Sequence, residues 1–250
     1  MPHPLIFSAG LQLTLSGCVL FAAMLPLQWM AAFGWRGFAA ALTCFAVVAT
    51  LVLLSLKHHK PHRNFGVANA VTLIRATAAT LMVGVVSEML LGGSLVVNAA
   101  LSWILVAAAT AALLLDGVDG WAARQTGMVS DFGARFDMEA DALFLLTMSL
   151  LAYATGKVGI WVLASGLMRY AFVLAGWLWP PLAAQLLPLW RRKAIYAVQV
   201  SALIAALAPV VPAEIAHAIC LMGIVLLSYS FGTDCVWLAR QPRNRRLQTP

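Results

Sequence analysis

Eight stretches of this 250-residue chain are each long and apolar enough to cross a lipid bilayer as a helix. A transmembrane helix needs about 20 mainly apolar residues. Such stretches can be placed at 8–30, 36–56, 69–89, 95–115, 138–156, 159–179, 195–212 and 214–238. Their Ala, Leu and Val runs favour helices over the alternating segments of a membrane β-barrel. Hydrophobic residues make up 62% of the chain and charged residues 10%, whereas soluble domains are only about 45–50% apolar. The sequence therefore predicts an all-α, polytopic membrane helix bundle.

Lys and Arg residues are divided unevenly between the two predicted membrane faces. If both termini face the cytoplasm, the opposite side receives only Arg36 and Lys157. The cytoplasmic side then receives Lys57, Lys60, Arg63, Arg124, Arg135, Arg191, Arg192, Lys193, Arg240, Arg243, Arg245 and Arg246. Cytoplasmic loops carry such an excess of positive charge, so we expect an integral protein of the plasma or inner membrane with cytoplasmic termini. This pattern and contacts with anionic lipids account for the net charge of +7 without any nucleic-acid partner.

A polar segment at 57–66, KHHKPHRNFG, marks a predicted domain boundary. It separates two N-terminal helices and a basic linker, residues 1–63, from a six-helix core at 64–240. A basic cytoplasmic tail at 241–250 follows the core. The segment also holds three histidines, His58, His59 and His62. They could bind a metal, but their spacing in a basic segment beside the membrane is more typical of a solvated interfacial stretch.

Carboxylates are concentrated in one segment, residues 116–141, which holds six of the nine acidic residues. Carboxylates at the edge of a bilayer are costly, so this segment is where we expect function. If the fourth helix continues past the membrane surface, Asp116 and Asp119 share one of its faces at i and i+3. Asp137 and Asp141 share a face of the next helix at i and i+4.

A short turn, marked by Gly127 and Gly133, should make these two helices antiparallel and bring the four carboxylates together. They would repel one another unless cations lay between them. Mg²⁺ and Mn²⁺ prefer oxygen ligands and bind substrate phosphates, and a metal pair is a known device for displacement at phosphorus. Small residues beside the carboxylates would let a diphosphate approach: Gly117, Gly120, Ala122 and Ala123. Arg124 could pair with phosphate. The segment therefore indicates phosphoryl-type chemistry at the cytoplasmic membrane surface.

The fixed positions of this segment read D-x2-D-G-x2-A-R-x8-G-x3-D-x3-D and resemble the signature of the CDP-alcohol phosphatidyltransferases. The resemblance covers about residues 64–235. It implies a six-helix membrane core that is usually homodimeric. It also implies transfer of a phosphatidyl group from a CDP-linked lipid, such as CDP-diacylglycerol, to an alcohol, with release of CMP, in phospholipid biosynthesis.

The resemblance also implies a role for each fixed position. Asp116, Asp119 and Asp137 are expected to bind two divalent cations, Mg²⁺ or Mn²⁺. Asp141 is expected to complete the second metal site and to act as the base that takes the proton from the attacking hydroxyl. The expected CDP pocket is lined by Gly120, Ala123 and Arg124.

Further candidates lie outside the acidic segment. Asn69-x2-Thr72-x2-Arg75 resembles the pattern that commonly opens the core in this family, which implies that Asn69 and Thr72 face the nucleotide. The expected acceptor-binding residues are Arg75, Arg169 and Lys193. Arg169 falls inside a predicted span, where an unpaired charge costs at least about 2.5–3.5 kcal/mol, so it should face a polar cavity or a carboxylate.

The run from Arg191 to Gln199, RRKAIYAVQ, partly resembles the Gly-Lys-x-Lys-Thr-x-x-Gln element of one branch of the family. Lys193 and Gln199 fit this element, whereas Ile195 and Tyr196 replace its second Lys and its Thr. The acceptor alcohol is therefore left open.

Three other functions share some of these sequence features. A divalent-cation or proton transporter can also use clustered aspartates, but a carrier should place them near the bilayer midplane. A Mg²⁺-dependent intramembrane prenyltransferase would need a second Asp-rich motif, and the sequence has none outside 116–141. A non-catalytic scaffold does not explain the four aspartates.

Overall fold

The computed structural model describes residues 3–59, 62–126, 130–178 and 190–240. All regular structure in these residues is helical, which confirms the all-α prediction. The described α-helices are α1 (His3–Ala31), α2 (Trp35–Ser55), α3 (Val67–Leu90), α4 (Ala99–Thr126), α5 (Asp131–Ala154), α6 (Leu163–Leu178), α7 (Trp190–Leu207) and α8 (Ala213–Arg240). Two short 3-10 helices, η1 (Leu56–His59) and η2 (Ile160–Val162), follow α2 and precede α6.

Six of the described helices are long and apolar enough to cross a membrane: α1, α2, α3, α4, α6 and α8. The protein is therefore an integral membrane protein. The other two predicted spans correspond to α5 and α7, which carry more charge. Asp137, Glu139 and Asp141 lie in the first half of α5. The first turn of α7 contains Arg191, Arg192 and Lys193.

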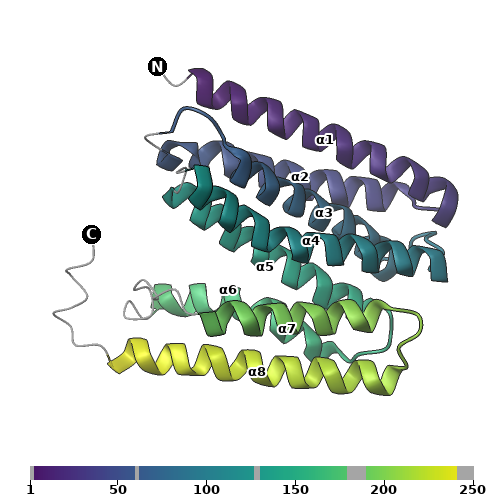
Figure 1. The fold of residues 1–250 in the computed structure, drawn as a ribbon. Helices are drawn as coiled ribbons and strands as arrows, with labels where there is room; N and C mark the ends of the chain where they lie inside the picture. The colour runs from purple at the N-terminus through teal and green to yellow at the C-terminus, as the bar shows by residue number, and fades with distance from the viewer. Residues whose placement is uncertain (1–2, 60–61, 127–129, 179–189, 241–250) are drawn as a thin grey trace.

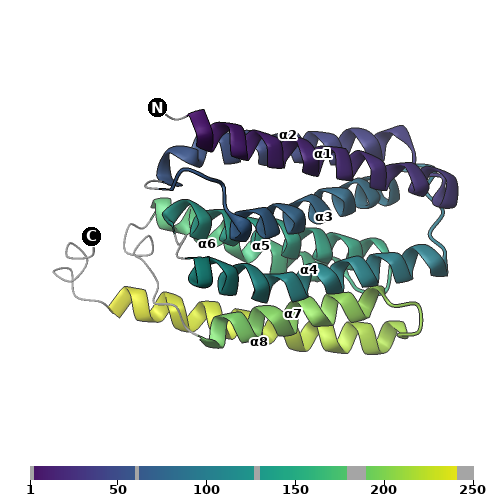
Figure 2. The same cartoon turned by 45° about the horizontal axis from the view of Figure 1, so that its top comes forward.

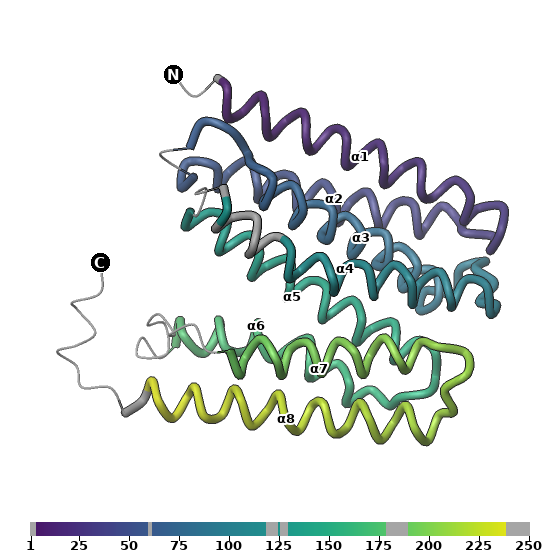
Figure 3. The backbone as a smooth tube through the Cα atoms, in the orientation of Figure 1, coloured from purple at the N-terminus to yellow at the C-terminus, as the bar shows by residue number. Residues whose placement is uncertain are grey.

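The helices run back and forth along one direction, so that the start of α1 and the end of α8 lie at the same end of the bundle (Figure 1). The tube in Figure 3 shows the α1–α2, α3–α4, α5–α6 and α7–α8 connections at the opposite end. We call the end that holds the start of α1 and the end of α8 the terminal end. α3 lies at the centre and packs against α1, α2, α4 and α5, while α7 and α8 pair on the far side of the bundle from α1 and α2 (Figures 1 and 2).

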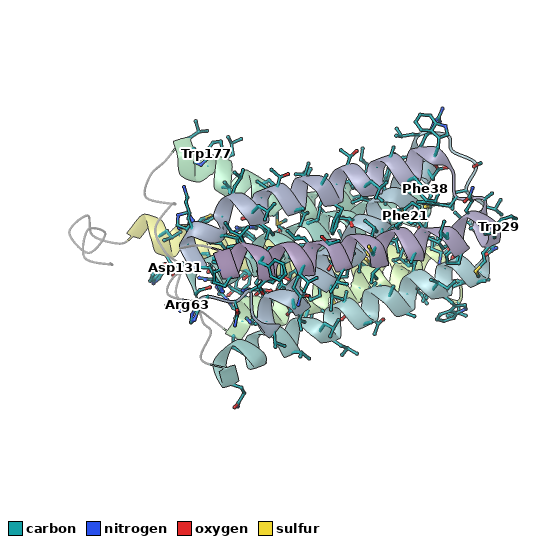
Figure 4. The ribbon with its side chains drawn as sticks, turned by 90° about the horizontal axis from the view of Figure 1, so that it is seen from above. Phe21, Trp29, Phe38, Arg63, Asp131 and Trp177 are labelled. Atoms are coloured by element: carbon teal, nitrogen blue, oxygen red, sulfur yellow. The ribbon has the colours of Figure 1, made fainter. Side chains whose placement is uncertain are left out.

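Exposed tryptophans lie toward both ends of the bundle. Trp29 is near the end opposite the termini, whereas Trp177 lies at the terminal end with the charged residues Arg63 and Asp131 (Figure 4). Both tryptophan side chains are largely exposed. Trp is enriched at the two membrane–water interfaces, so this distribution fits a bundle that spans the bilayer along its long direction.

The two N-terminal helices pack closely on the core. A Cβ atom on Gly84 of α3 would lie 2.7 Å from the carbonyl oxygen of Gly37 in α2, so the two backbones nearly touch. Glu88 is buried at the end of α3, and its carboxylate accepts hydrogen bonds from the backbone N–H groups of Gly37 (2.7 Å) and Ser94 (3.1 Å). A carboxylate at the N-terminus of a helix satisfies free N–H groups and complements the helix dipole. Glu88 therefore anchors α2 to α3. The division of the chain into two domains at residue 63 stays a prediction.

Candidate active site

Three of the four predicted aspartates come together at the site. α4 continues to Thr126, as expected, and carries Asp116, while α5 presents Asp137 and Asp141 one turn apart. One carboxylate oxygen from each of these three residues lies within 4.8 Å of the others. Their side chains are partly buried, with exposed fractions of 21% to 32%. The helix pairing that the acidic segment predicts therefore produces a cluster of carboxylates.

Arg75 of α3 holds this cluster together. Its Nη2 lies 2.7 Å from Asp116 Oδ1 and also pairs with Asp141 Oδ1, and its Nη1 lies 2.9 Å from Asp137 Oδ1. The side chain is only 3% exposed. α3 packs against both α4 and α5, which explains how one guanidinium reaches carboxylates from two helices. The structure thus places Arg75 among the aspartates, and its role in acceptor binding stays a prediction.

The donor set suits hard divalent cations. All three groups are carboxylates, which Mg²⁺ and Mn²⁺ prefer. With one positive and three negative side chains, the cluster keeps a surplus of negative charge that a cation can offset.

The remaining fixed positions of the signature lie in a part of α4 whose side chains are outside the described residues: Asp119, Gly120, Ala123 and Arg124. Gly127 also lies outside the described residues. Among the described residues, no heavy atom would lie within 4 Å of a Cβ atom on Gly117, just before this stretch. Gly133 was expected in the turn, but it lies in the first turn of α5 because that helix already begins at Asp131.

Asn69 and Thr72 are buried on α3, about two turns and one turn before Arg75, respectively. Asn69 Nδ2 donates a hydrogen bond to the Phe65 carbonyl, and Thr72 Oγ1 donates to the Ala68 carbonyl at 3.1 Å. Their contact with a nucleotide stays a prediction.

Tyr196 of α7 is a site residue that the sequence analysis did not assign. Its hydroxyl lies 3.3 Å from Asp141 Oδ1 and 3.4 Å from the Asp141 carbonyl oxygen. The available signal was the replacement of Thr by Tyr in the 191–199 run, which puts a longer polar side chain on the helix. Tyr196 thus helps to orient Asp141.

The two other predicted acceptor-binding residues lie on α6 and α7. Arg169 Nη2 donates to Glu139 Oε1 of α5 at 2.5 Å, so this intramembrane arginine has a carboxylate partner. Lys193 is exposed in the first turn of α7. Neither position tests a role in acceptor binding.

Asp234 of α8 pairs with both arginines that precede Lys193, which the sequence analysis did not foresee. Its Oδ1 lies 2.9 Å from Arg191 Nη2, and its Oδ2 lies 2.6 Å from Arg192 Nε. These ion pairs hold the start of α7 against α8.

The expectation of a solvated histidine stretch is wrong for His59. This side chain is fully buried, and its ring stacks edge-to-face on Phe132 with centroids 5.3 Å apart. Its Nδ1 lies 2.8 Å from Ser130 Oγ, and its Nε2 lies 3.0 Å from the Asn64 carbonyl oxygen. The segment folds back onto the start of α5, because its own Phe65 packs with Phe132 and Phe136 of that helix in an aromatic cluster.

The fold and this cluster define a helical membrane protein with an acidic site toward one end of the bundle. The model of the CDP-alcohol phosphatidyltransferase family matches residues 65–229, and the chain belongs to this family. It is therefore a transferase that acts on a CDP-linked alcohol. The match confirms the resemblance and leaves α1 and α2 outside the matched residues. Comparisons with curated proteins and with solved structures found no match.

Proposed function

We propose that this protein transfers a phosphatidyl group from a CDP-linked lipid, such as CDP-diacylglycerol, to the hydroxyl of an alcohol acceptor and releases CMP. The observation that carries the proposal is the cluster of Asp116, Asp137 and Asp141, whose oxygens lie within 4.8 Å of one another inside the family-matched residues. The reaction would serve phospholipid biosynthesis.

The aspartates would hold two divalent cations, Mg²⁺ or Mn²⁺. The proposed ligands are Asp116, Asp119, Asp137 and Asp141. Bound cations would neutralise the diphosphate and stabilise the charge that develops on the leaving group. The proposed CDP contacts are Asn69, Thr72, Gly120, Ala123 and Arg124.

Asp141 acts as the general base in this proposal. Its carboxylate accepts the proton of the acceptor hydroxyl, whose oxygen forms a bond to the β-phosphorus. The bond from that phosphorus to the bridging oxygen breaks, and CMP leaves with the electron pair. General-base assistance contributes about 10²–10⁴-fold to a rate. The hydrogen bond from Tyr196 supports this role, since it restrains the carboxylate that must meet the hydroxyl.

The site belongs to the cytoplasmic face in this proposal. The linker and the first turn of α7 carry Lys57, Arg63, Arg191, Arg192 and Lys193 at the terminal end. A water-soluble CMP product would leave on that side. Arg169 and Lys193 are the proposed acceptor contacts, and the working form is a homodimer.

The test uses purified protein with Mn²⁺, CDP-diacylglycerol and a panel of acceptors: glycerol 3-phosphate, serine, inositol phosphate, phosphatidylglycerol and choline. Mass spectrometry of the lipid product identifies the acceptor, and CMP release gives the rate. Asp141→Asn should lower turnover by at least about 10²-fold while nucleotide binding is largely kept. Near-normal CMP release by this variant would refute the role of Asp141, and no lipid product with any acceptor would refute the proposed reaction.

A further inference from the structure

His59 joins the segment after α2 to the first turn of α5. The residue ends η1, which directly continues α2, and so belongs to the part of the chain before the family-matched residues. Its ring nitrogens contact Asn64 in the following linker and Ser130 at the start of α5. No water reaches the ring, because its exposed fraction is 0%.

The hydrogen-bond inventory fixes the direction of each contact for a neutral ring. The Asn64 carbonyl can only accept, so His59 Nε2 carries the proton and Nδ1 is an acceptor. Ser130 must then donate its hydroxyl proton to Nδ1. The same hydroxyl oxygen accepts a hydrogen bond from the Gly133 backbone N–H at 3.0 Å, which makes Ser130 the N-cap of α5. His59 therefore holds the capping hydroxyl in the orientation in which its lone pair faces the helix.

The capped turn leads directly to the carboxylates. Gly133, Asp137 and Asp141 follow one another at i, i+4 and i+8, so they lie along one face of α5. The turn also has little freedom to move toward α3, since a Cβ atom on Gly133 would lie 2.9 Å from Asn69 Oδ1. A loss of the cap would loosen this turn, and of the three clustered carboxylates Asp137 is the one closest to it along the chain.

We propose that His59 is a positioning residue for the cation site. Through Ser130, α2 and the segment that follows it hold the first turn of α5 so that Asp137 and Asp141 face Asp116. This gives α2 a task in the cation site, although the helix lies outside the family-matched residues. The inference rests on the proposed function, because it requires the aspartates to bind divalent cations.

Two conservative replacements separate the contacts of His59. Asn can offer an oxygen near the place of Nδ1 and keep the acceptor for Ser130, whereas Gln can reach the place of Nε2 and keep only the bond to Asn64. We expect His59→Gln to weaken Mn²⁺ binding roughly fivefold, as loss of a helix cap would. His59→Asn should stay within about twofold of the wild type by the same reasoning. Mn²⁺ alone is the probe, and electron paramagnetic resonance of the full-length protein in detergent measures the free ion.

The matched control is His58→Ala, because His58 is exposed and its Nδ1 lies 3.3 Å from the Ser55 carbonyl oxygen of the preceding turn rather than near α5. Ser130→Ala should weaken Mn²⁺ binding as much as His59→Gln does. The double variant, with both His59→Gln and Ser130→Ala, should bind Mn²⁺ no more weakly than Ser130→Ala alone. If His59→Gln does not fold, the Ser130→Ala and His59→Asn variants decide the matter in the same assay.

Equal losses for His59→Asn and His59→Gln would overturn the inference, as would wild-type Mn²⁺ affinity in His59→Gln or Ser130→Ala. A wild-type protein that binds no Mn²⁺ would instead refute the proposed function, and this inference with it.

Discussion

Arg75 is the positive charge that keeps the three aspartates together without a metal, and replacing it should make the stability of the protein depend on divalent cations. At a distance of 4.8 Å, two carboxylates repel each other by about 3.5 kcal/mol at an effective dielectric constant of about 20. The three pairs amount to roughly 10 kcal/mol. Each attraction to Arg75 is worth about 4 kcal/mol at a charge separation of about 4 Å, so one guanidinium offsets the whole repulsion.

Arg75→Gln removes this compensation. Protonation of a carboxylate and the partial exposure of the aspartates relieve much of the repulsion, so we expect a loss of about 3 kcal/mol, the lower end for a broken buried ion pair. That loss corresponds to a fall in Tm of about 6–12 °C for a chain of this size. Thermal unfolding in detergent with a chelator measures it. Saturating Mn²⁺ should remove at least half of the difference in Tm between the variant and the wild type, because the cations then supply the missing positive charge.

Arg169→Gln is the control, since Arg169 pairs with the single carboxylate of Glu139, whose side chain is 56% exposed. Such a pair contributes about 0–1 kcal/mol, so its small effect should be the same with and without Mn²⁺. The reasoning is refuted if Arg75→Gln unfolds at the wild-type temperature in chelator, or if Mn²⁺ leaves the gap unchanged.

Two further predictions concern Tyr196 and Glu88. Tyr196→Phe removes a hydroxyl that donates a hydrogen bond to Asp141 across 3.3 Å. Since such a bond contributes about 0.5–1.5 kcal/mol, turnover measured by CMP release should fall about two- to tenfold. An unchanged rate would show that the hydroxyl does not orient Asp141. Glu88→Gln weakens the hydrogen bonds that hold α2 to α3, far from the clustered aspartates. The free energy of unfolding should fall by about 1–3 kcal/mol, while Mn²⁺ affinity stays at the wild-type value. A loss of Mn²⁺ affinity would show that Glu88 also affects the cation site.

The sequence predicted the helices and the clustered aspartates of the site more fully than the residues that pair with those aspartates. Apolar runs determine where helices lie, and the i, i+4 spacing places Asp137 and Asp141 on one face, so the helical bundle and the meeting of these residues with Asp116 could be read from local patterns. The partnership of Arg75 with the same residues spans 62 and 66 positions of the chain in two of its contacts. No local pattern encodes which helix packs against which.

His59 illustrates a second limit. A run of histidines and lysines beside a predicted span has the composition of a solvated segment, and composition alone cannot show that Phe132 and Phe136 of α5 create an aromatic surface for it. The same holds for Asp234, whose two arginine partners lie 42 and 43 positions away. Charge pairs and buried polar residues depend on tertiary contacts, whereas amphipathic periodicity does not.

The near contact of Gly37 with Gly84 also determines by which route a lipid can enter. Where two helix backbones approach this closely, the gap is narrower than a hydrocarbon tail, and no side-chain rotation can widen it. The seam between α2 and α3 is therefore closed to molecules diffusing in the bilayer at that depth. The lipid substrate of the proposed reaction would therefore not pass between α2 and α3 at the depth of Gly37 and Gly84.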